Sequence, residues 1–101
     1  MFKHVVIWQV REDLPREEEV RIKAAIKEQI EALNGTIPGL IDVRVYIDEL
    51  PTSNAKVLLD SSFTDAEAAA VYNDHPDHVA IKENLIMPNL TNRLCMDYVV
   101  E

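Results

Sequence analysis

Residues 71–78, "VYNDHPDH", hold two of the three histidines of the chain and one of its three tyrosines. A neutral imidazole accepts a proton near physiological pH, and a nearby phenol can donate a hydrogen bond to a developing oxyanion. His78 and Tyr72 are therefore a candidate base and oxyanion donor for removing a proton next to a carbonyl group, the first step of aldol or Claisen ring closure. The residues alone leave a structural alternative open, in which His78 binds a backbone carbonyl and Tyr72 packs its ring into the core.

The same segment also has residue types that bind metal ions. His75 and His78 are three residues apart with aspartates beside them, and such side chains suit zinc or another divalent ion. However, Pro76 lies inside the spacing, and the only distant candidate for a third ligand is His4. We therefore expect no metal and no other cofactor. Because it precedes proline, His75 should be extended, and we expect it to cap the next helix as a supporting residue.

Three further side chains could serve a site or only the core. Trp8 could wall a cleft or fill the core of a dimer, and we favour the dimer core. Cys95 is the only cysteine, so no disulfide can form within the chain, and we expect it to be a buried structural residue. Asp97 follows on the same strand face, and a structural contact with Arg93 is plausible.

Composition excludes several classes of protein. The 101 residues make one domain, and the net charge of −8 argues against binding nucleic acid or an anionic membrane surface. The N-terminal apolar run is too short to span a bilayer and lacks the cleavage site of a secretory signal. Only two glycines occur, so a glycine-rich phosphate-binding loop is excluded. We expect a cytoplasmic protein.

The first half of the chain is predicted as strand, helix and strand. Residues 3–10 form a strand with His4 and Trp8 on one face, and a helix follows with Asp13 as N-cap and Gly35 as its left-handed C-cap. The strand over residues 40–48 alternates, with its apolar side chains on one face. These inward residues are Ile41, Val43, Val45 and Ile47.

The second half is predicted as strand, broken helix and strand. After a strand over residues 56–63, Thr64 and Glu67 form a capping box for a helix that Pro76 interrupts. Pro88 ends the second helical piece, and residues 92–100 form the last strand. The order βαββαβ indicates an α+β, ferredoxin-like domain, with a four-stranded antiparallel sheet and both helices on one face. The open face would carry bulky side chains, such as Trp8, Tyr46, Leu58 and Tyr98 or their neighbours, so we expect a homodimer that closes two sheets together.

With these elements placed, the whole chain resembles the stress-responsive A/B barrel (Dabb) domain. The resemblance rests on "FKHVVIWQV", "IPGLIDVRV", "FTDAEAAAVYNDHPDH" and "NRLCMDYVV". It implies one Dabb domain over residues 1–101, paired into a dimeric α+β barrel. Some plant members are polyketide cyclases, in which a histidine and a tyrosine act in a cleft between helices and sheet. By this resemblance His78 and Tyr72 match the catalytic pair, while His4 and His75 match positions that line or support the cleft.

Three functional hypotheses follow. The first is a cofactor-independent cyclase, lyase or isomerase acting on a small, apolar, carbonyl-containing molecule. The second is a non-catalytic ligand-binding or stress-related dimer, and the third is cofactor-free oxygenation like that of the antibiotic-biosynthesis monooxygenases. After His78 the chain carries Lys82 and Glu83, and the bulky aromatic residues that wall the cyclase pocket are not matched there. The resemblance therefore supports the fold more strongly than it supports a polyketide substrate.

Overall fold

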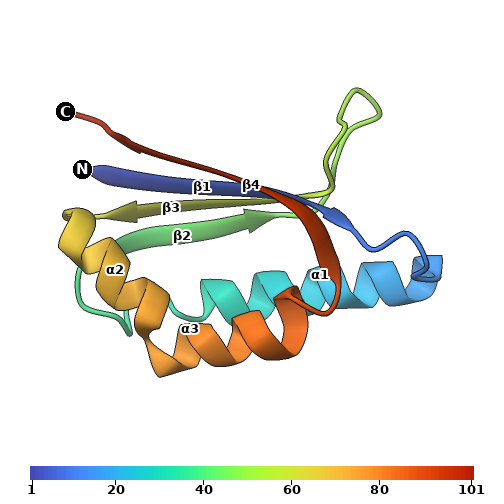
Figure 1. Cartoon of the computed structure of the whole chain (residues 1–101), viewed down its shortest axis with the longest axis horizontal. Coiled ribbons are helices and arrows are strands. Elements are labelled where there is room, and N and C mark those ends of the chain that lie inside the picture. The colour runs from blue at the N-terminus through green and yellow to red at the C-terminus, as the bar shows by residue number, and fades with distance from the viewer.

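The computed structural model describes residues 1–101 and contains one sheet with helices on one side (Figure 1). Its elements are β1 (Phe2–Val10), α1 (Arg16–Glu31), β2 (Leu40–Tyr46), β3 (Val57–Phe63), α2 (Ala66–Asp74), α3 (Pro76–Ile81), the π-helical turn η1 (Lys82–Ile86) and β4 (Leu90–Val99). None of the helices has the length and apolar character needed to cross a bilayer.

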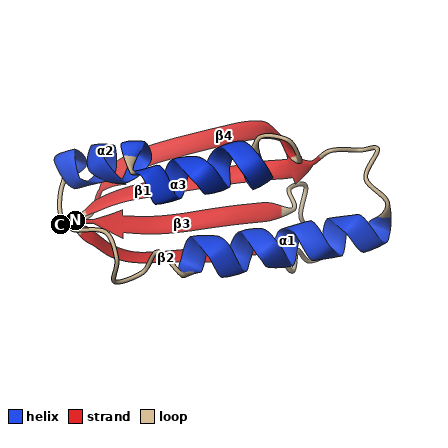
Figure 2. Ribbon diagram, turned by 90° about the horizontal axis from the view of Figure 1, so that it is seen from below, coloured by secondary structure: helices blue, strands red, loops and turns tan.

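The four strands are antiparallel in the order β2-β3-β1-β4, and the helices cover one face (Figure 2). This arrangement confirms the predicted ferredoxin-like fold. The core lies between sheet and helices because alternate residues of the strands and the apolar stripe of α1 point into the same layer. Its most deeply buried side chains include Val6, Val43, Val45, Phe63, Ile26 and Ile30.

The predicted alternation fails at one position of β2. The pairing of β2 with β3 shifts between Leu40 and Asp42, so Ile41 lies at a bulge and is 53% exposed. A bulge adds one residue to one strand and locally breaks the ladder, which releases that residue from the face its neighbours share. Val43 and Val45 point inward as predicted, whereas β2 ends at Tyr46, before Ile47.

The predicted N-caps of α1 and α2 are both displaced. Helix α1 has Pro15 at its N-cap, and Asp13 instead pairs with Arg11 at 2.6 Å. Helix α2 is capped by Asp65, whose carboxylate accepts a 2.8 Å hydrogen bond from the Ala68 N–H. Aspartate and threonine are both good N-caps, so neighbouring candidates compete and the backbone path decides between them.

The predicted C-cap of α1 is displaced as well. Gly35 has the expected positive φ of 81°, but the helix already ends at Glu31, with Ala32 as its C-cap. The left-handed residue therefore belongs to the turn after the helix.

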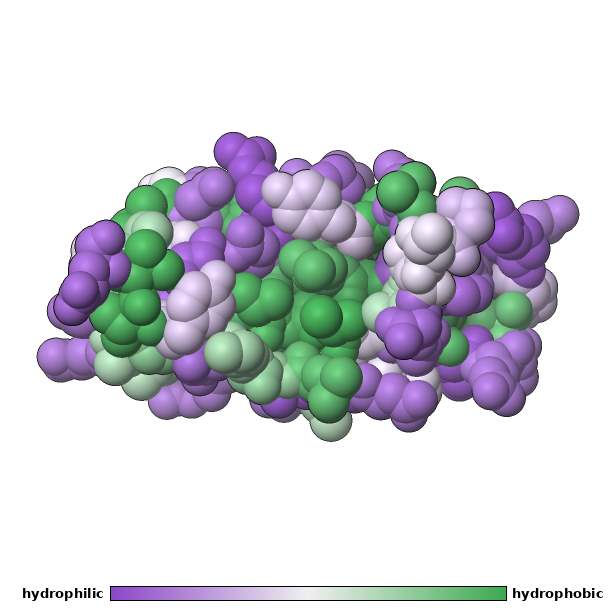
Figure 3. Space-filling model, turned by 90° about the horizontal axis from the view of Figure 1, so that it is seen from above, coloured by the Kyte–Doolittle hydropathy of each residue, from purple (hydrophilic) through white to green (hydrophobic).

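The face of the sheet opposite the helices carries an uncovered apolar row. Tyr46, Leu58, Ile7 and Leu94 are successive register partners across all four strands. Figure 3 looks onto this face and shows apolar side chains gathered at its centre. Leu94 is 70% exposed and Tyr46 is 56% exposed, so a substantial apolar surface of the single chain faces solvent. Trp8 is not part of this face, because it points toward the helices and is buried.

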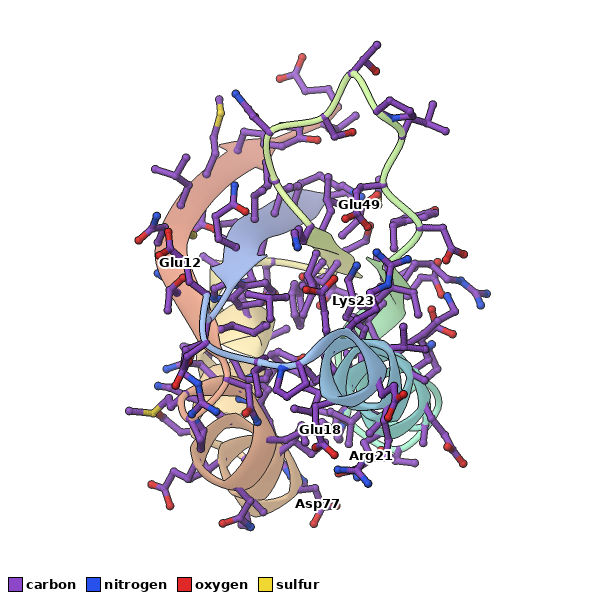
Figure 4. The ribbon with its side chains drawn as sticks, turned by 90° about the vertical axis from the view of Figure 1, so that its right-hand side faces the viewer. Glu12, Glu18, Arg21, Lys23, Glu49 and Asp77 are labelled. Atoms are coloured by element: carbon purple, nitrogen blue, oxygen red, sulfur yellow. The ribbon has the colours of Figure 1, made fainter.

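A charged cluster anchors α1 to the β2–β3 hairpin at the end of the molecule away from α2. Lys23 lies 2.7 Å from Glu49 and 3.6 Å from Glu19, which in turn binds Lys56 at 2.9 Å. Figure 4 shows Lys23 directed from the helix toward Glu49 on the connecting loop. The bond from Lys56 holds the pKa of Glu19 below its ordinary value, although burial acts in the opposite direction. Because each charge of the cluster has a partner, we assign it a structural role.

Candidate active site

The break between α2 and α3 sets the direction of the histidines. Helix α2 ends at Asp74, and Pro76 occupies the first turn of α3. His75 is extended between them, and its Nδ1 accepts a 3.1 Å hydrogen bond from the Asp77 N–H. Pro76 favours this geometry because it pushes the preceding residue out of the helical region and suits the first helical position. His75 is therefore the cap of α3, as expected.

His78 is a buried histidine with one ring nitrogen occupied. Its Nδ1 lies 3.1 Å from the backbone carbonyl of Asn73. A carbonyl can only accept, so Nδ1 carries the hydrogen and Nε2 of the neutral ring keeps its lone pair. Burial lowers the pKa of His78; the Asn73 carbonyl opposes this, and the positive charge of Lys82 adds to it. The ring is therefore neutral at physiological pH, with Nε2 available as a base.

Tyr72 lies against His78 and has an unpaired hydroxyl. The two ring centroids are 4.3 Å apart, and Phe63 packs on Tyr72 at 5.2 Å. The Tyr72 hydroxyl is buried and has no hydrogen-bond partner. Burial raises the pKa of the phenol well above its ordinary value, so the hydroxyl keeps its proton and remains a donor.

Both residues line a cleft of about 520 Å³ between the sheet and the helical segment that runs from α2 to η1. The cleft is bounded by β1, β4, α3 and η1, and its lining residues are His4, Val6, Trp8, Leu59, Tyr72, Asn73, His78, Lys82, Ile86, Met87, Leu90, Thr91, Asn92 and Arg93. The structure thus brings His4, Trp8, Tyr72 and His78 to one hollow, while His75 lies outside the lining. Trp8 lines the cleft, which was one of its two expected roles, whereas the expected place in the dimer core is wrong because the side chain lies on the helix-facing side of β1.

His4 forms a second polar cluster at the β1–β4 edge of the cleft. Its Nδ1 lies 2.5 Å from the Asp97 carboxylate. Asp97 was expected to contact Arg93, but it pairs with His4 instead. The Cys95 thiol lies 3.5 Å from the same nitrogen and is exposed, contrary to the expected burial, because β4 is an edge strand. Partial desolvation of the sulfur by its neighbours and the negative charge of Asp97 raise the pKa of this thiol. The three ligand atoms lie within 4.8 Å of one another, so this cluster, and not the pair His75 and His78, has the grouping that a metal ion would need.

Sequence reasoning missed the two cations of the cleft as functional residues. Lys82 begins η1, and Arg93 lies in β4 beside a register shift opposite Trp8. Counting along the antiparallel pairing of the first and last strands would have placed Arg93 near Trp8, since Leu94 pairs with Ile7. No local signal indicates the shift itself.

Comparisons with known proteins agree with the fold of this chain. A dimeric protein of unknown function with a ferredoxin-like fold from Bacteroides fragilis is 30% identical, with 98% of this chain and 95% of that chain covered and a TM-score of 0.91. A Dabb family protein from Mesorhizobium loti is 27% identical, with 99% and 96% covered and a TM-score of 0.76.

A hydroxynitrile lyase from Passiflora edulis shares the fold at 12% identity, with 99% and 93% covered and a TM-score of 0.77. No match is found among proteins with curated descriptions. The family model of the stress responsive A/B barrel domain matches residues 2–100, which is nearly the whole chain. The protein therefore belongs to the stress responsive A/B barrel (Dabb) domain family.

Proposed function

We propose that this protein performs cofactor-independent acid–base chemistry on a small, largely apolar carbonyl compound bound in the cleft. His78 acts as the base and Tyr72 as the hydrogen-bond donor to the carbonyl oxygen. The fold alone does not select this reaction, since one fold serves many chemistries. The proposal therefore rests on the residues of the site.

The observation that carries the proposal is the unpaired hydroxyl of Tyr72 beside the free Nε2 of His78. A buried hydroxyl without a partner costs about 1–3 kcal/mol, and native proteins seldom keep one without a role. A ligand carbonyl oxygen would accept this hydrogen bond. Since the donor is already in place and shielded from water, it would stabilise negative charge that develops on that oxygen.

The proposed reaction begins with breaking of a C–H bond next to the carbonyl. The proton moves to Nε2 of His78, and the electron pair of the bond passes to the carbonyl oxygen, giving an enolate that Tyr72 stabilises. Attack of the enolate carbon on a second carbonyl would form a new carbon–carbon bond, after which His78 returns its proton to the new alkoxide. With no second carbonyl present, the proton returns to carbon, and the enzyme only exchanges the hydrogen.

That exchange gives a direct test. Acetophenone and para-acetylbenzoate are incubated with the protein in D2O, and loss of the methyl proton signal is followed by NMR. We expect His78→Asn, which retains a donor for the Asn73 carbonyl, and Tyr72→Phe each to lower the exchange rate by about 10²-fold or more. His75→Asn is the matched control, because His75 caps α3 outside the cleft lining, and its rate should stay near that of the wild type.

The competing hypotheses give different results in the same experiment. A non-catalytic ligand-binding protein would bind the ketones without exchanging their protons. A cofactor-free oxygenase would consume molecular oxygen in step with loss of its substrate. Exchange that is equal in wild type and His78→Asn would refute the proposed role of His78.

The proposal includes a homodimer in which two open sheet faces pack together. The apolar row Tyr46, Leu58, Ile7 and Leu94 supports it, and the relative from Bacteroides fragilis is described as dimeric. Burying such a row in a two-fold interface removes apolar surface from water on both copies. The absence of nucleic-acid or membrane partners is also part of this proposal and is supported by the net charge of −8. A cytoplasmic location is a further part of it.

A further inference from the structure

The cleft differs in charge from the rest of the protein. The chain has 18 acidic and 10 basic residues, yet the lining of the cleft contains Lys82 and Arg93 and no aspartate or glutamate. Each of three other hollows in the surface is lined by at least one carboxylate. Although the protein as a whole is negatively charged, the charged side chains that line this cleft are positive.

The two cations of the cleft are also unpaired. Seven of the ten lysines and arginines form ion pairs within 4.0 Å, namely Lys3, Arg11, Arg21, Lys23, Lys27, Arg44 and Lys56. The remaining three are Arg16, Lys82 and Arg93, and two of these line the cleft. Because carboxylates outnumber cations in this chain, a cation without an ion-pair partner is the exception, and two of the three exceptions lie in the lining of the cleft.

Local backbone irregularities accompany both cations. Between the pairs Ile7–Leu94 and Gln9–Thr91, β1 contributes only Trp8 while β4 contributes Asn92 and Arg93, so β4 has a bulge there. Asn92 takes a positive φ of 54°, an uncommon conformation for a residue other than glycine. Bulges redirect side chains and are frequent next to active sites. Lys82 begins a π-helical turn, another local irregularity that is frequent at functional sites.

We propose that the cleft binds an apolar carbonyl compound that carries a carboxylate group, and that Lys82 and Arg93 bind this carboxylate. The apolar walls formed by Val6, Trp8 and Ile86 contact the hydrocarbon part of the ligand. This inference rests on the proposed function for the position of the ligand, and adds its chemical class. Both cations are exposed, so they lie at the rim of the cleft, while His78 and Tyr72 are buried within it. The carboxylate end of the ligand therefore lies toward the mouth and the reacting carbonyl toward the inside.

The charge of Lys82 has a second consequence that fits the same assignment. It contributes to the lowered pKa of His78, after burial as the main cause. His4 and His75 act on the pKa of His78 in the same direction, and Asp97 pairs with His4. The cations at the rim therefore attract an anionic ligand, and Lys82 also helps to keep the base unprotonated.

The test compares an acid with its neutral amide of the same shape. Phenylbutyrate and phenylbutyramide are titrated into the protein, and binding is followed by the fluorescence of Trp8, the only tryptophan, which lines the cleft. Calorimetry in parallel detects binding that leaves the fluorescence unchanged. We expect the wild type to bind the acid about tenfold more tightly than the amide, since charge-assisted hydrogen bonds are stronger than neutral ones.

The variants assign this preference to the two cations. Lys82→Gln and Arg93→Gln should each lower the affinity for the acid about tenfold and change that for the amide by less than about twofold. Arg16→Gln is the matched control, because Arg16 is the third unpaired cation and lies outside the cleft lining. Its affinities should equal those of the wild type.

Equal affinity for acid and amide would overturn this inference, as would failure of both compounds to bind. Preference for the acid that survives in both cleft variants would also overturn it. A different result would refute the proposed function. If the acid binds as expected but acetophenone and para-acetylbenzoate show no proton exchange that depends on His78, the carboxylate assignment stands and the chemistry does not.

Discussion

Substitution of Tyr72 by phenylalanine should stabilise the protein while lowering the proposed proton-exchange activity. In most cores a buried tyrosine hydroxyl is hydrogen-bonded, and its removal costs about 0.5–1.5 kcal/mol. Here the hydroxyl has no partner, so Tyr72→Phe removes a desolvation cost of about 1–3 kcal/mol while keeping the ring contacts with Phe63 and His78. We expect a gain of about 1 kcal/mol, since partial relaxation reduces the full value.

The gain is measurable by thermal and chemical denaturation at one protein concentration, because the stability of a dimer depends on concentration. For a domain of this size, about 1 kcal/mol corresponds to a rise in Tm of about 4–8 °C. Ser61→Ala is the control of opposite sign. Ser61 is fully buried and donates a 2.8 Å hydrogen bond to the carbonyl of His4, so its loss should destabilise the protein by about 1 kcal/mol. A Tyr72→Phe protein that loses 1 kcal/mol or more would show that the hydroxyl is already satisfied, and the reasoning behind the proposed donor would be wrong.

Three other predictions concern the interface, a turn and pH. Leu94→Glu should weaken the dimer about 10²-fold or more, as measured by light scattering, because each copy would lose an apolar side chain from the interface and bury a charged glutamate there instead. Val20→Glu, on the exposed side of α1, should leave the dimer affinity unchanged. Gly39→Ala should destabilise the fold by about 2 kcal/mol or more, since a Cβ there would lie 2.4 Å from the methyl group of Ala68 in α2. Gly35 has a similar φ but open space around it, so Gly35→Ala should cost about 1 kcal/mol. Equal losses of stability in denaturation experiments would refute this prediction. The folded pKa of His78 lies below its ordinary value of 6.5, so the unfolded state binds more protons as the pH falls through 6.5, and stability is full above that pH and declines below it. His78→Asn should remove this part of the pH dependence of Tm, and proton exchange in the wild type should stay active below pH 6.5.

Most elements were predictable because their signals are local. Alternation along residues 3–10 indicated β1 and its buried face, and Pro76 marked the break between α2 and α3. The fold class followed from the order of the elements. The exposure of Ile41 and the displaced caps were not predictable, since each depends on a register shift or a backbone path set by distant partners.

The site was predictable only in part, for a similar reason. Tyr72 and His78 are close in sequence, so their association could be proposed from one segment. His4 meets Asp97 and Arg93 reaches the cleft only through the pairing of the first and last strands, and a bulge in that pairing has no sequence signature. The exposure of Cys95 likewise follows from the position of β4 at the sheet edge.

A crystal structure with para-acetylbenzoate bound would test the central claim most directly. We predict the ketone oxygen within about 2.6–3.2 Å of the Tyr72 hydroxyl and the methyl carbon facing Nε2 of His78, with the carboxylate at Lys82 and Arg93. A ligand bound in this cleft with its carbonyl away from Tyr72 and its methyl group away from His78 would contradict the acid–base assignment.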